Sequence, residues 1–397
     1  MKALLLLFTP IILFATSLET LINHAKNNHN SLKTLEQRVL VVESDIARSQ
    51  NFADPMLSLS MGDIQFNDVL DRTREPMQYT AVALQQKISY FGKRHAKQAK
   101  LEAEKKLSEI GIDAMKIKLV QAIKLTAYDI WKIEEDLKIV DEYFKLTKQN
   151  IELSSGYASS DSSSHMGIMS AEMTLSELRI KYSKLSSTRE ALYKNLSYLS
   201  AMEVTQIDLD LSIQKHKHID LYQKVKHQNL TYKSKLAKLQ VQNKNITIKE
   251  LEKYPDPTIQ VGYFQRQKYN DYMNLSVSFP LPIYGSQDLE IQKAQKLSLA
   301  AQSEVADTNQ LLDAQITKIH SKIEDAFRVY DIIQNQSMPQ IQHMFDLSST
   351  SIKNGEELFV YLNLLERKLK LDEKSIEVIA NYNKYLAQLD ALIGEMQ

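Results

Sequence analysis

The residues best suited to binding a metal ion lie in a short methionine-rich stretch. His165 is followed by Met166, Met169 and Met173 on a segment whose pattern predicts a helix. Thioether and imidazole groups are soft ligands that suit Cu(I) or Ag(I). The same spacing of three and seven positions also occurs where methionines fill the seam between packed helices. Both interpretations stay open, and we assign no metal ligand here.

No other group of side chains predicts catalytic chemistry. His216 and His218 are two positions apart, so on a helix they diverge, which argues against a shared metal ion. The chain has no cysteine, which excludes disulfides and thiolate metal sites. It has no glycine-rich phosphate loop and no evident Ser/His/Asp set, and the acidic run at 134–136 is typical of a solvated helix face. We therefore expect that the protein is not an enzyme and needs no cofactor.

Long helices must make up most of the chain. Apolar residues in the ranges 130–144 and 362–393 recur in alternating steps of four and three, which predicts helices packed as coiled coils. At 1.5 Å per residue, the run 92–155 would be about 95 Å long, which is more than a globular core requires. The clearest seam consists of Leu312, Ile316, Ile319, Ile323, Ala326, Tyr330 and Ile333.

Breaks in these helices are few, because the chain has only 9 Gly and 8 Pro. Gly and Asn favour the left-handed conformation that ends a helix. The stretch from Ser154-Ser155-Gly156 to Ser164 and the pair Asn354-Gly355 therefore predict the turns of two helical hairpins. Pro339 predicts a kink or break in the second long helix.

Two pairs of short strands separate the helical runs. The first pair is expected at 56–63 and 79–86, and the second between Pro257 and Gly285. Apolar residues on one side of each strand fit a membrane barrel wall, and they also fit a soluble hairpin packed on a helix. Four strands cannot close a barrel, which needs about eight. Since open sheet edges are not tolerated in lipid, the membrane interpretation requires several copies of the chain.

The N-terminus and the composition indicate an exported protein. Met1-Lys2, the apolar run 3–14 and Ala15-Thr16-Ser17 form the three parts of a secretory signal, so we predict cleavage after Ser17. The alternative is a buried N-terminal helix, and the apolar run is too short to span a bilayer. With 49 basic and 49 acidic residues, the chain offers no electrostatic reason to bind nucleic acid.

The order of helix, strand pair and long helical hairpin occurs twice. After a signal peptide at 1–17, we predict a first repeat at 18–200, with its strand pair at 55–90. A connecting belt segment follows at 201–215. The second repeat spans 216–394, with its strand pair at 256–283.

Four stretches carry a resemblance to a known family. The Asp-Pro stretches 53–60 and 254–261, the stretch Ser-Phe-Pro-Leu-Pro-Ile-Tyr-Gly at 278–285 and the stretch Ile-Lys-Asn-Gly-Glu-Glu-Leu at 352–358 are typical of it. Together they resemble the outer-membrane efflux protein family, of which TolC is the archetype. The resemblance covers essentially all of the chain after the signal segment.

The resemblance implies a mainly α fold with a small β part. Three copies would share a twelve-stranded outer-membrane barrel, and their coiled-coil helices would form a periplasmic tunnel. The homotrimer would contact outer-membrane lipid, a periplasmic adaptor protein and, through it, an inner-membrane pump of the RND type. The implied site residues are the strand boundaries Pro55, Gly92, Pro257, Pro280, Pro282 and Gly285, the adaptor-docking tips Gly156, Tyr157, Asn354, Gly355, Glu356, Glu357 and Leu358, and the aperture candidate Tyr361.

Some features depart from the family pattern or leave alternatives. The first tip is rich in serine, and Tyr361 and Leu364 stand where the archetype has paired aspartates, so no acidic ring is implied. The stretches 75–80 and 85–94 resemble the heavy-metal branch of the family. The alternatives are drug or dye efflux, type I protein secretion and, more distantly, a periplasmic coiled-coil scaffold. If the tip is assigned correctly, Gly355→Pro is expected to abolish export.

Overall fold

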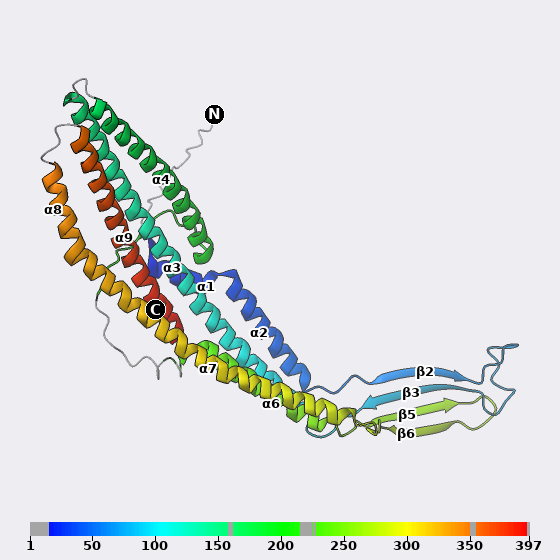
Figure 1. The fold of residues 1–397 in the computed structure, drawn as a ribbon. Coiled ribbons are helices and arrows are strands. Elements are labelled where there is room, and N and C mark those ends of the chain that lie inside the picture. The colour runs from blue at the N-terminus through cyan, green and yellow to red at the C-terminus, as the bar shows by residue number, and fades with distance from the viewer. Residues whose placement is uncertain (1–15, 158–161, 215–224, 226–227, 350–354, 395–397) are drawn as a thin grey trace, which may run out of the picture. The chain divides into compact units, whose positions relative to one another are not determined.

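The computed structural model describes residues 16–157, 162–214, 225, 228–349 and 355–394. The chain is mainly helical with a small antiparallel sheet, which confirms the predicted fold class (Figure 1). Within the described ranges, no helix combines the length and hydropathy that crossing a membrane would require. The helical elements are α1 (Leu18–Asn28), α2 (Asn30–Ser49), α3 (Lys93–Tyr157), α4 (Ser162–Ser200), α6 (Leu230–Leu251), α7 (Ser286–Ile332), the π-helical turn η1 (Ile333–Ser337), α8 (Met338–Ser349) and α9 (Gly355–Ile393).

The chain divides into two compact units. The helical unit takes its described residues from 1–34, 112–230 and 310–397, and the strand unit comprises 35–111 and 231–309. The helical unit also holds β1 (Thr16–Ser17), which pairs in parallel with β4 (Ile207–Asp208). β4 lies in the predicted belt segment. The predicted signal peptide lies outside the described residues except for Thr16 and Ser17, and cleavage after Ser17 stays a prediction.

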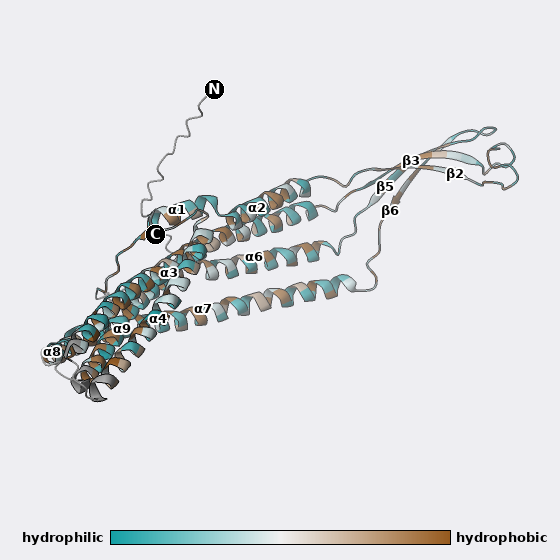
Figure 2. Cartoon of the chain, turned by 90° about the horizontal axis from the view of Figure 1, so that it is seen from above, coloured by the Kyte–Doolittle hydropathy of each residue, from teal (hydrophilic) through white to brown (hydrophobic). Residues whose placement is uncertain are grey.

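Helices α3, α4, α8 and α9 lie side by side in the helical unit (Figure 1). Helix α9 contacts α4 on one side and α8 on the other, and α3 packs against both α4 and α9. Hydrophobic and hydrophilic residues alternate along these helices, as amphipathic packing requires (Figure 2). The predicted seam, which runs along α7 to the start of η1, is buried or partly buried against α9 around Ile323, Ala326 and Ile333.

Polar links hold α3 and α9 in one antiparallel register. Lys124 contacts Asp390 at 3.2 Å, Lys384 forms an ion pair with Asp129, and the Tyr143 hydroxyl donates to Asp372 at 2.6 Å. Each later residue of α3 thus meets an earlier residue of α9. Register cannot slip without breaking all three links at once.

Pro339 does not break the helix, although a break was one of the two outcomes, kink or break, that the sequence predicts. The chain widens into the π-helical turn η1 and then continues as α8 from Met338. The amide of Met338 donates to the carbonyl of Ile333, five positions earlier. Proline has no amide hydrogen and its ring crowds the preceding turn, so a wider turn before Pro339 relieves the clash.

The strand unit contains one sheet with the strand order β2-β3-β5-β6. Its strands are β2 (Met56–Gly62), β3 (Tyr79–Lys87), β5 (Thr258–Gln265) and β6 (Tyr272–Ser278). All neighbouring strands are antiparallel, and β3 pairs with β5 along its whole length, with Thr80 opposite Gln265 and Lys87 opposite Thr258. The two predicted hairpins therefore join into a single sheet whose edges, β2 and β6, have no partner within the chain.

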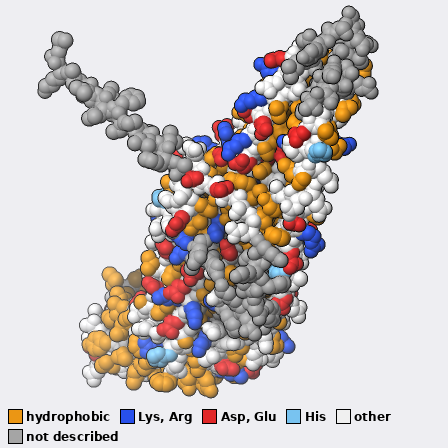
Figure 3. Space-filling model, turned by 90° about the vertical axis from the view of Figure 1, so that its left-hand side faces the viewer, with side chains coloured by type: hydrophobic (Ala, Val, Ile, Leu, Met, Phe, Trp, Pro, Cys, Tyr) orange, Lys and Arg blue, Asp and Glu red, His pale blue; other side chains and the backbone are white. Residues whose placement is uncertain are grey.

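Charged pairs tie the helices of the strand unit together. Lys105 of α3 contacts Glu43 of α2 at 2.8 Å. Glu304 of α7 accepts from Lys235 and Lys238 of α6, at 2.8 and 2.9 Å, and these bonds lower the pKa of Glu304 to about 2. Over the chain's surface, residues of both signs are interspersed on the face shown in Figure 3, which agrees with the balanced composition.

Candidate functional site: a two-faced sheet and its junctions with the helices

The sheet has one apolar face and one face of small and polar residues. Register places Leu57, Leu84, Val261 and Leu275 side by side across the four strands, and Leu59, Val82, Tyr263 and Met273 form the next row. The row between them, on the opposite face, consists of Ser58, Ala83, Gly262 and Asn274.

The apolar face is open in this chain. Leu59 is 75% exposed and Leu275 is 73% exposed, and their neighbours in the two apolar rows are similarly uncovered. Leaving a continuous apolar surface of this kind in water is unfavourable, because burying apolar surface stabilises a protein by about 25 cal/mol for each Å². No helix among the described residues covers this face, so the packing expected for a soluble hairpin on a helix is not seen in this chain.

Exposed aromatic residues mark the end of the sheet nearest the helices. Phe91 and Tyr284 are 92% and 90% exposed, and each is followed by the glycine that immediately precedes a long helix. Tyr90 and Tyr254 stack with ring centroids 4.6 Å apart. Aromatic side chains in this position are typical of the boundary between lipid and water.

Asp256 organises the junction between strands and helices. Its Oδ1 accepts from the Tyr90 amide and from the Lys93 Nζ, both at 2.8 Å, and Lys93 also donates to the Tyr254 carbonyl at 2.6 Å. Burial alone would raise the pKa of Asp256, but the hydrogen bonds from Lys93 and Tyr90 hold it below its ordinary value. The Asp-Pro pair thus fastens the start of β5 to the start of α3.

This geometry predicts a pH-dependent contribution from Asp256. Because the folded pKa is lowered, the stabilisation is complete above the unfolded pKa of 3.8 and is lost as pH falls through the lower folded pKa. Asp256→Asn should lower the free energy of unfolding at pH 7 by about 1–2 kcal/mol and by much less near pH 2. Thermal denaturation at both pH values measures this. Asp54→Asn, at the exposed Asp-Pro pair of the first repeat, should leave the free energy of unfolding unchanged at both pH values. Equal effects of the two variants would contradict the role of Asp256.

Gly92 and Gly285 turn the chain from strand to helix at matching places in the two repeats. Their φ angles are +87° and +70°, in the left-handed region that other residues rarely adopt. The other predicted boundary residues, Pro55, Pro257, Pro280 and Pro282, flank β2, β5 and β6. All six therefore lie at the ends of strands or helices, and their functional assignment stays a prediction.

Alanine at either glycine should destabilise the protein through backbone strain alone. A Cβ at Gly285 would meet nothing within 4 Å, and one at Gly92 would touch Leu251 only at 3.8 Å. We expect Gly92→Ala and Gly285→Ala each to lower the free energy of unfolding by about 1–2 kcal/mol. Gly111→Ala, within α3, should instead raise it by about 0.5–1 kcal/mol, since alanine is the better helix former. Thermal unfolding followed by circular dichroism shows whether each variant raises or lowers the free energy of unfolding. If Gly111→Ala lowered it as much as the other two variants, the prediction would be contradicted.

The two predicted tips lie at the same end of the helical unit (Figure 1). Helix α3 ends at Tyr157 and α9 begins at Gly355, and the antiparallel register of these helices brings the two ends together. The turns themselves, 158–161 and 350–354 with Asn354, lie outside the described residues. The adaptor-docking role of Gly156, Tyr157 and residues 354–358 stays a prediction.

The two tip glycines lie at helix boundaries, where the sequence predicts the turns of the helical hairpins. Gly156 lies inside α3, one residue before its end, and Gly355 is the first residue of α9. Proline is tolerated in the first turn of a helix, because the amide it lacks would have no helical partner there. The expectation that Gly355→Pro abolishes export is therefore withdrawn, since the substitution is compatible with this helix start.

The aperture candidate Tyr361 lies in the core of the helical unit. Its side chain is 3% exposed and packs at 5.0 Å from Phe345, between α8 and α9. Leu364, the other position where the archetype is acidic, is also buried. In a single chain neither side chain faces open space, so a role of Tyr361 in an aperture stays a prediction that requires this core to rearrange.

The methionine-rich stretch lies on α4 with its thioethers uncovered. Met166, Met169 and Met173 are all exposed, so they do not fill a seam within the chain. The side chain of His165 and the pair His216 and His218 lie outside the described part. Among the described residues, no three His, Asp or Glu side chains gather as a metal site would require.

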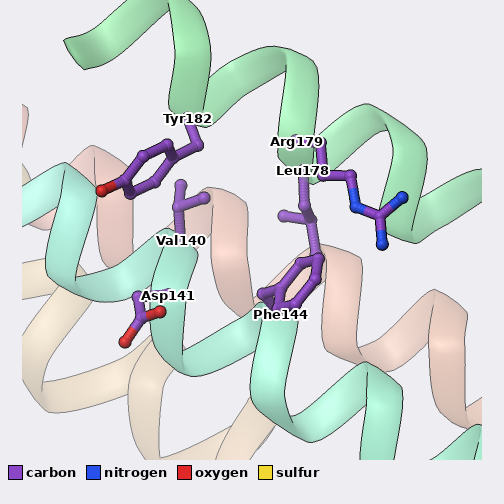
Figure 4. A pocket seen from close by; sticks show the side chains of 6 residues that line it. All are labelled: Val140, Asp141, Phe144, Leu178, Arg179 and Tyr182. Carbon is purple, nitrogen blue, oxygen red and sulfur yellow. The ribbon is translucent and has the colours of Figure 1, made fainter.

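A small pocket opens between α3 and α4 (Figure 4). Its cavity of about 240 Å³ is lined by Val140, Asp141, Phe144, Leu178, Arg179 and Tyr182. The Arg179 guanidinium lies 5.5 Å from the centre of the Phe144 ring, and Asp141 forms an ion pair with Lys145. The pocket therefore has no unpaired acid or nucleophile that predicts catalysis.

No pattern in the sequence predicts the folded loop between β2 and β3. The Gln78 amide is buried and donates to the carbonyls of Asp63 and Asp71, at 3.2 and 2.9 Å. Its oxygen accepts from the amides of Arg74 and Glu75. One glutamine side chain thus joins several backbone groups of a polar loop. These groups become its hydrogen-bond partners only because the loop folds back on itself.

The fold is that of solved bacterial outer-membrane channels. CmeC of Campylobacter jejuni is 15% identical over 95% of this chain and 85% of its own, with a TM-score of 0.76. The open state of Neisseria gonorrhoeae MtrE is 14% identical over 95% and 89%, with a TM-score of 0.79. VceC of Vibrio cholerae is 12% identical over 96% and 97%, with a TM-score of 0.76. No protein-family model and no curated protein matches the chain.

Proposed function

We propose that this protein is the outer-membrane channel of a tripartite efflux system and is not an enzyme. The observation that carries the proposal is the open apolar face of the sheet, backed by a face of Ser, Ala and Gly residues. An apolar outer band with a polar interior is what a membrane barrel wall requires. The shared fold with CmeC and MtrE, both described as outer membrane channels, supports the same function.

The two open edges of the sheet require a ring of copies. Strands β2 and β6 have no partner within the chain, and unpaired backbone groups are not tolerated in lipid. Pairing β6 of one copy with β2 of the next would close a barrel, and the resemblance to the outer-membrane efflux family implies three copies with four strands from each. We therefore assign the protein as a homotrimer in the outer membrane, with the helices extending into the periplasm.

The outer helices of the helical unit support the same ring. Helices α4 and α8 flank α9, and both carry exposed apolar residues. Met166, Met169 and Met173 on α4, and Met344 and Leu347 on α8, fit a contact between α4 of one copy and α8 of the next. Such a contact would explain the exposed methionines without a metal ion, but it gives no role to His165.

The partners are those that the family resemblance implies. A periplasmic adaptor protein would dock at Gly156–Tyr157 and residues 354–358 and link the channel to an inner-membrane pump of the RND type. Adaptor contact would spread the coiled coils and widen the opening. Transport is driven by the pump, and this chain supplies a water-filled conduit without a tight site for its substrate.

Purified protein tests the channel directly. Cross-linked protein should run as a trimer, and its addition to a planar lipid bilayer should produce discrete conductance steps. A monomer that forms no conducting pore would overturn the proposal in favour of the periplasmic scaffold. The scaffold alternative also gives no reason for an open apolar sheet face.

For the substrate we propose heavy-metal cations, on the resemblance of residues 75–80 and 85–94 to that branch. A deletion strain should become sensitive to copper, silver, zinc, cobalt or cadmium, and the gene should restore growth. Sensitivity confined to dyes and detergents would keep the channel and assign it to drug efflux. Loss of an exported protein, with normal resistance, would assign it to type I secretion.

A further inference from the structure

Three aromatic rings gather at the loop end of the small-residue face. The Phe264 ring lies edge-on to Tyr79, with centroids 4.9 Å apart, and stacks on Tyr272 at 4.8 Å. Register pairs Phe264 with Tyr272 and with Ala81, so all three rings lie on the same face as Ala81 and Ser60. Bulky rings on a face of mostly small and polar residues narrow the space in front of it.

Two glycines let these rings lie close to the backbone. A Cβ at Gly62 would fall 2.3 Å from the Tyr79 ring, and one at Gly262 would fall 2.9 Å from the Phe264 ring. Both distances are shorter than real contacts. The rings are therefore seated in defined positions on the sheet and do not project freely from it.

Arg266 lies against the cluster and places a positive charge beside it. Its guanidinium carbon lies 5.1 Å from the centre of the Tyr272 ring, and the guanidinium donates to the carbonyls of Asn270 and Pro76, at 2.8 and 3.4 Å. Asp271 accepts from the backbone amide of Arg266 at 2.8 Å. The Asp271 carboxylate interacts electrostatically with this guanidinium and offsets part of its charge.

We propose that Tyr79, Phe264 and Tyr272, held by Arg266, form a constriction at the loop end of the pore and that Arg266 sets its charge preference. The proposal rests on the proposed function, in which this face lines the lumen. Each copy would contribute one set of rings and one guanidinium. Because the guanidinium is always charged and only partly offset by Asp271, it lowers the preference of the constriction for cations without closing the lumen to the metal cations of the proposed function.

Ion selectivity in planar bilayers tests the role of Arg266. Under a potassium chloride gradient, Arg266→Gln should raise the ratio of potassium to chloride permeability about threefold, as expected for removing a few screened charges from a lumen. Arg266→Lys should keep the wild-type ratio. Lys268→Gln removes the same charge from an exposed position two residues away and should change the ratio far less.

Conductance tests the rings. Phe264→Ala and Tyr272→Ala should each raise single-channel conductance, whereas Val277→Ala, on the apolar face, should leave it unchanged. Normal channels whose selectivity and conductance do not respond to any of these variants would overturn the constriction and leave the channel in place. Failure of the wild-type protein to form channels would overturn both proposals.

Discussion

Leu275→Arg is expected to abolish assembly in the outer membrane, whereas Ser276→Arg should be tolerated. Leu275 lies in the middle of β6, in the apolar row with Leu57, Leu84 and Val261. An arginine facing lipid near the centre of a bilayer costs about 2–4 kcal/mol, and every copy in the ring carries it. Ser276 belongs to the opposite face, where the same charge would meet water.

Membrane fractionation and the yield of detergent-resistant oligomer measure this difference. The two variants differ by one position and carry the same new charge, so they separate the face from general effects on the strand. Leu59→Arg in β2 should behave like Leu275→Arg, because it lies in the neighbouring apolar row. Equal assembly of the Leu275 and Ser276 variants would mean that the apolar face does not meet lipid.

Tyr143→Ala is expected to cause the largest loss of stability in the helical unit. Tyr143 is 2% exposed and packs with Val140, Leu178 and Leu365 where α3, α4 and α9 meet. Removing a buried aromatic side chain typically costs about 3–5 kcal/mol. Its hydroxyl also donates to Asp372 at 2.6 Å, so the variant breaks one of the three links between α3 and α9.

Two further variants separate packing from hydrogen bonding. Tyr143→Phe keeps the ring and removes the donor to Asp372, for an expected loss of about 1–2 kcal/mol. Tyr182→Ala removes a half-exposed tyrosine from α4 and should cost less than about 1 kcal/mol. Chemical unfolding followed by circular dichroism gives all three values. If Tyr143→Ala were as stable as Tyr182→Ala, the packing of α3 against α9 within one chain would be wrong.

The sequence was sufficient where a pattern repeats along a single element. Heptad spacing located the helices now seen as α3, α7 and α9, and Ile323, Ile333, Leu365 and Leu369 are buried where the seam predicts. Period-two alternation located the strands to within about a residue or two. Both patterns report which side of one element is apolar, and that depends only on neighbouring residues.

Register between strands required the tertiary structure. The first strand pair alternates too weakly to identify its two faces from sequence. The pairing of β3 with β5 aligns Val82 and Leu84 with the apolar residues of the second strand pair. Leu57 and Leu59 lie opposite Leu84 and Val82, so they belong to the same apolar face. A shift of one residue would have exchanged the faces, so only the long-range pairing settles them.

Burial of single residues was also beyond the sequence. Methionines 166, 169 and 173 have the spacing of a buried seam but are exposed, while Tyr361 is buried although its motif suggested an aperture. Pro339 acts through a π-helical turn, and Gly355 starts a helix. In each case the outcome depends on which neighbouring helix covers the residue or where the next helix begins.

The sequence by itself thus determined the kinds of element, their lengths and their twofold repetition, because these follow from local periodicity. The tertiary structure decided which faces are shared, which edges stay open, and that Tyr79, Phe264, Tyr272 and Arg266 meet on one face. Those features join residues almost two hundred positions apart, such as Tyr79 and Phe264. Their proximity is set by the pairing of β3 with β5, which no local pattern encodes.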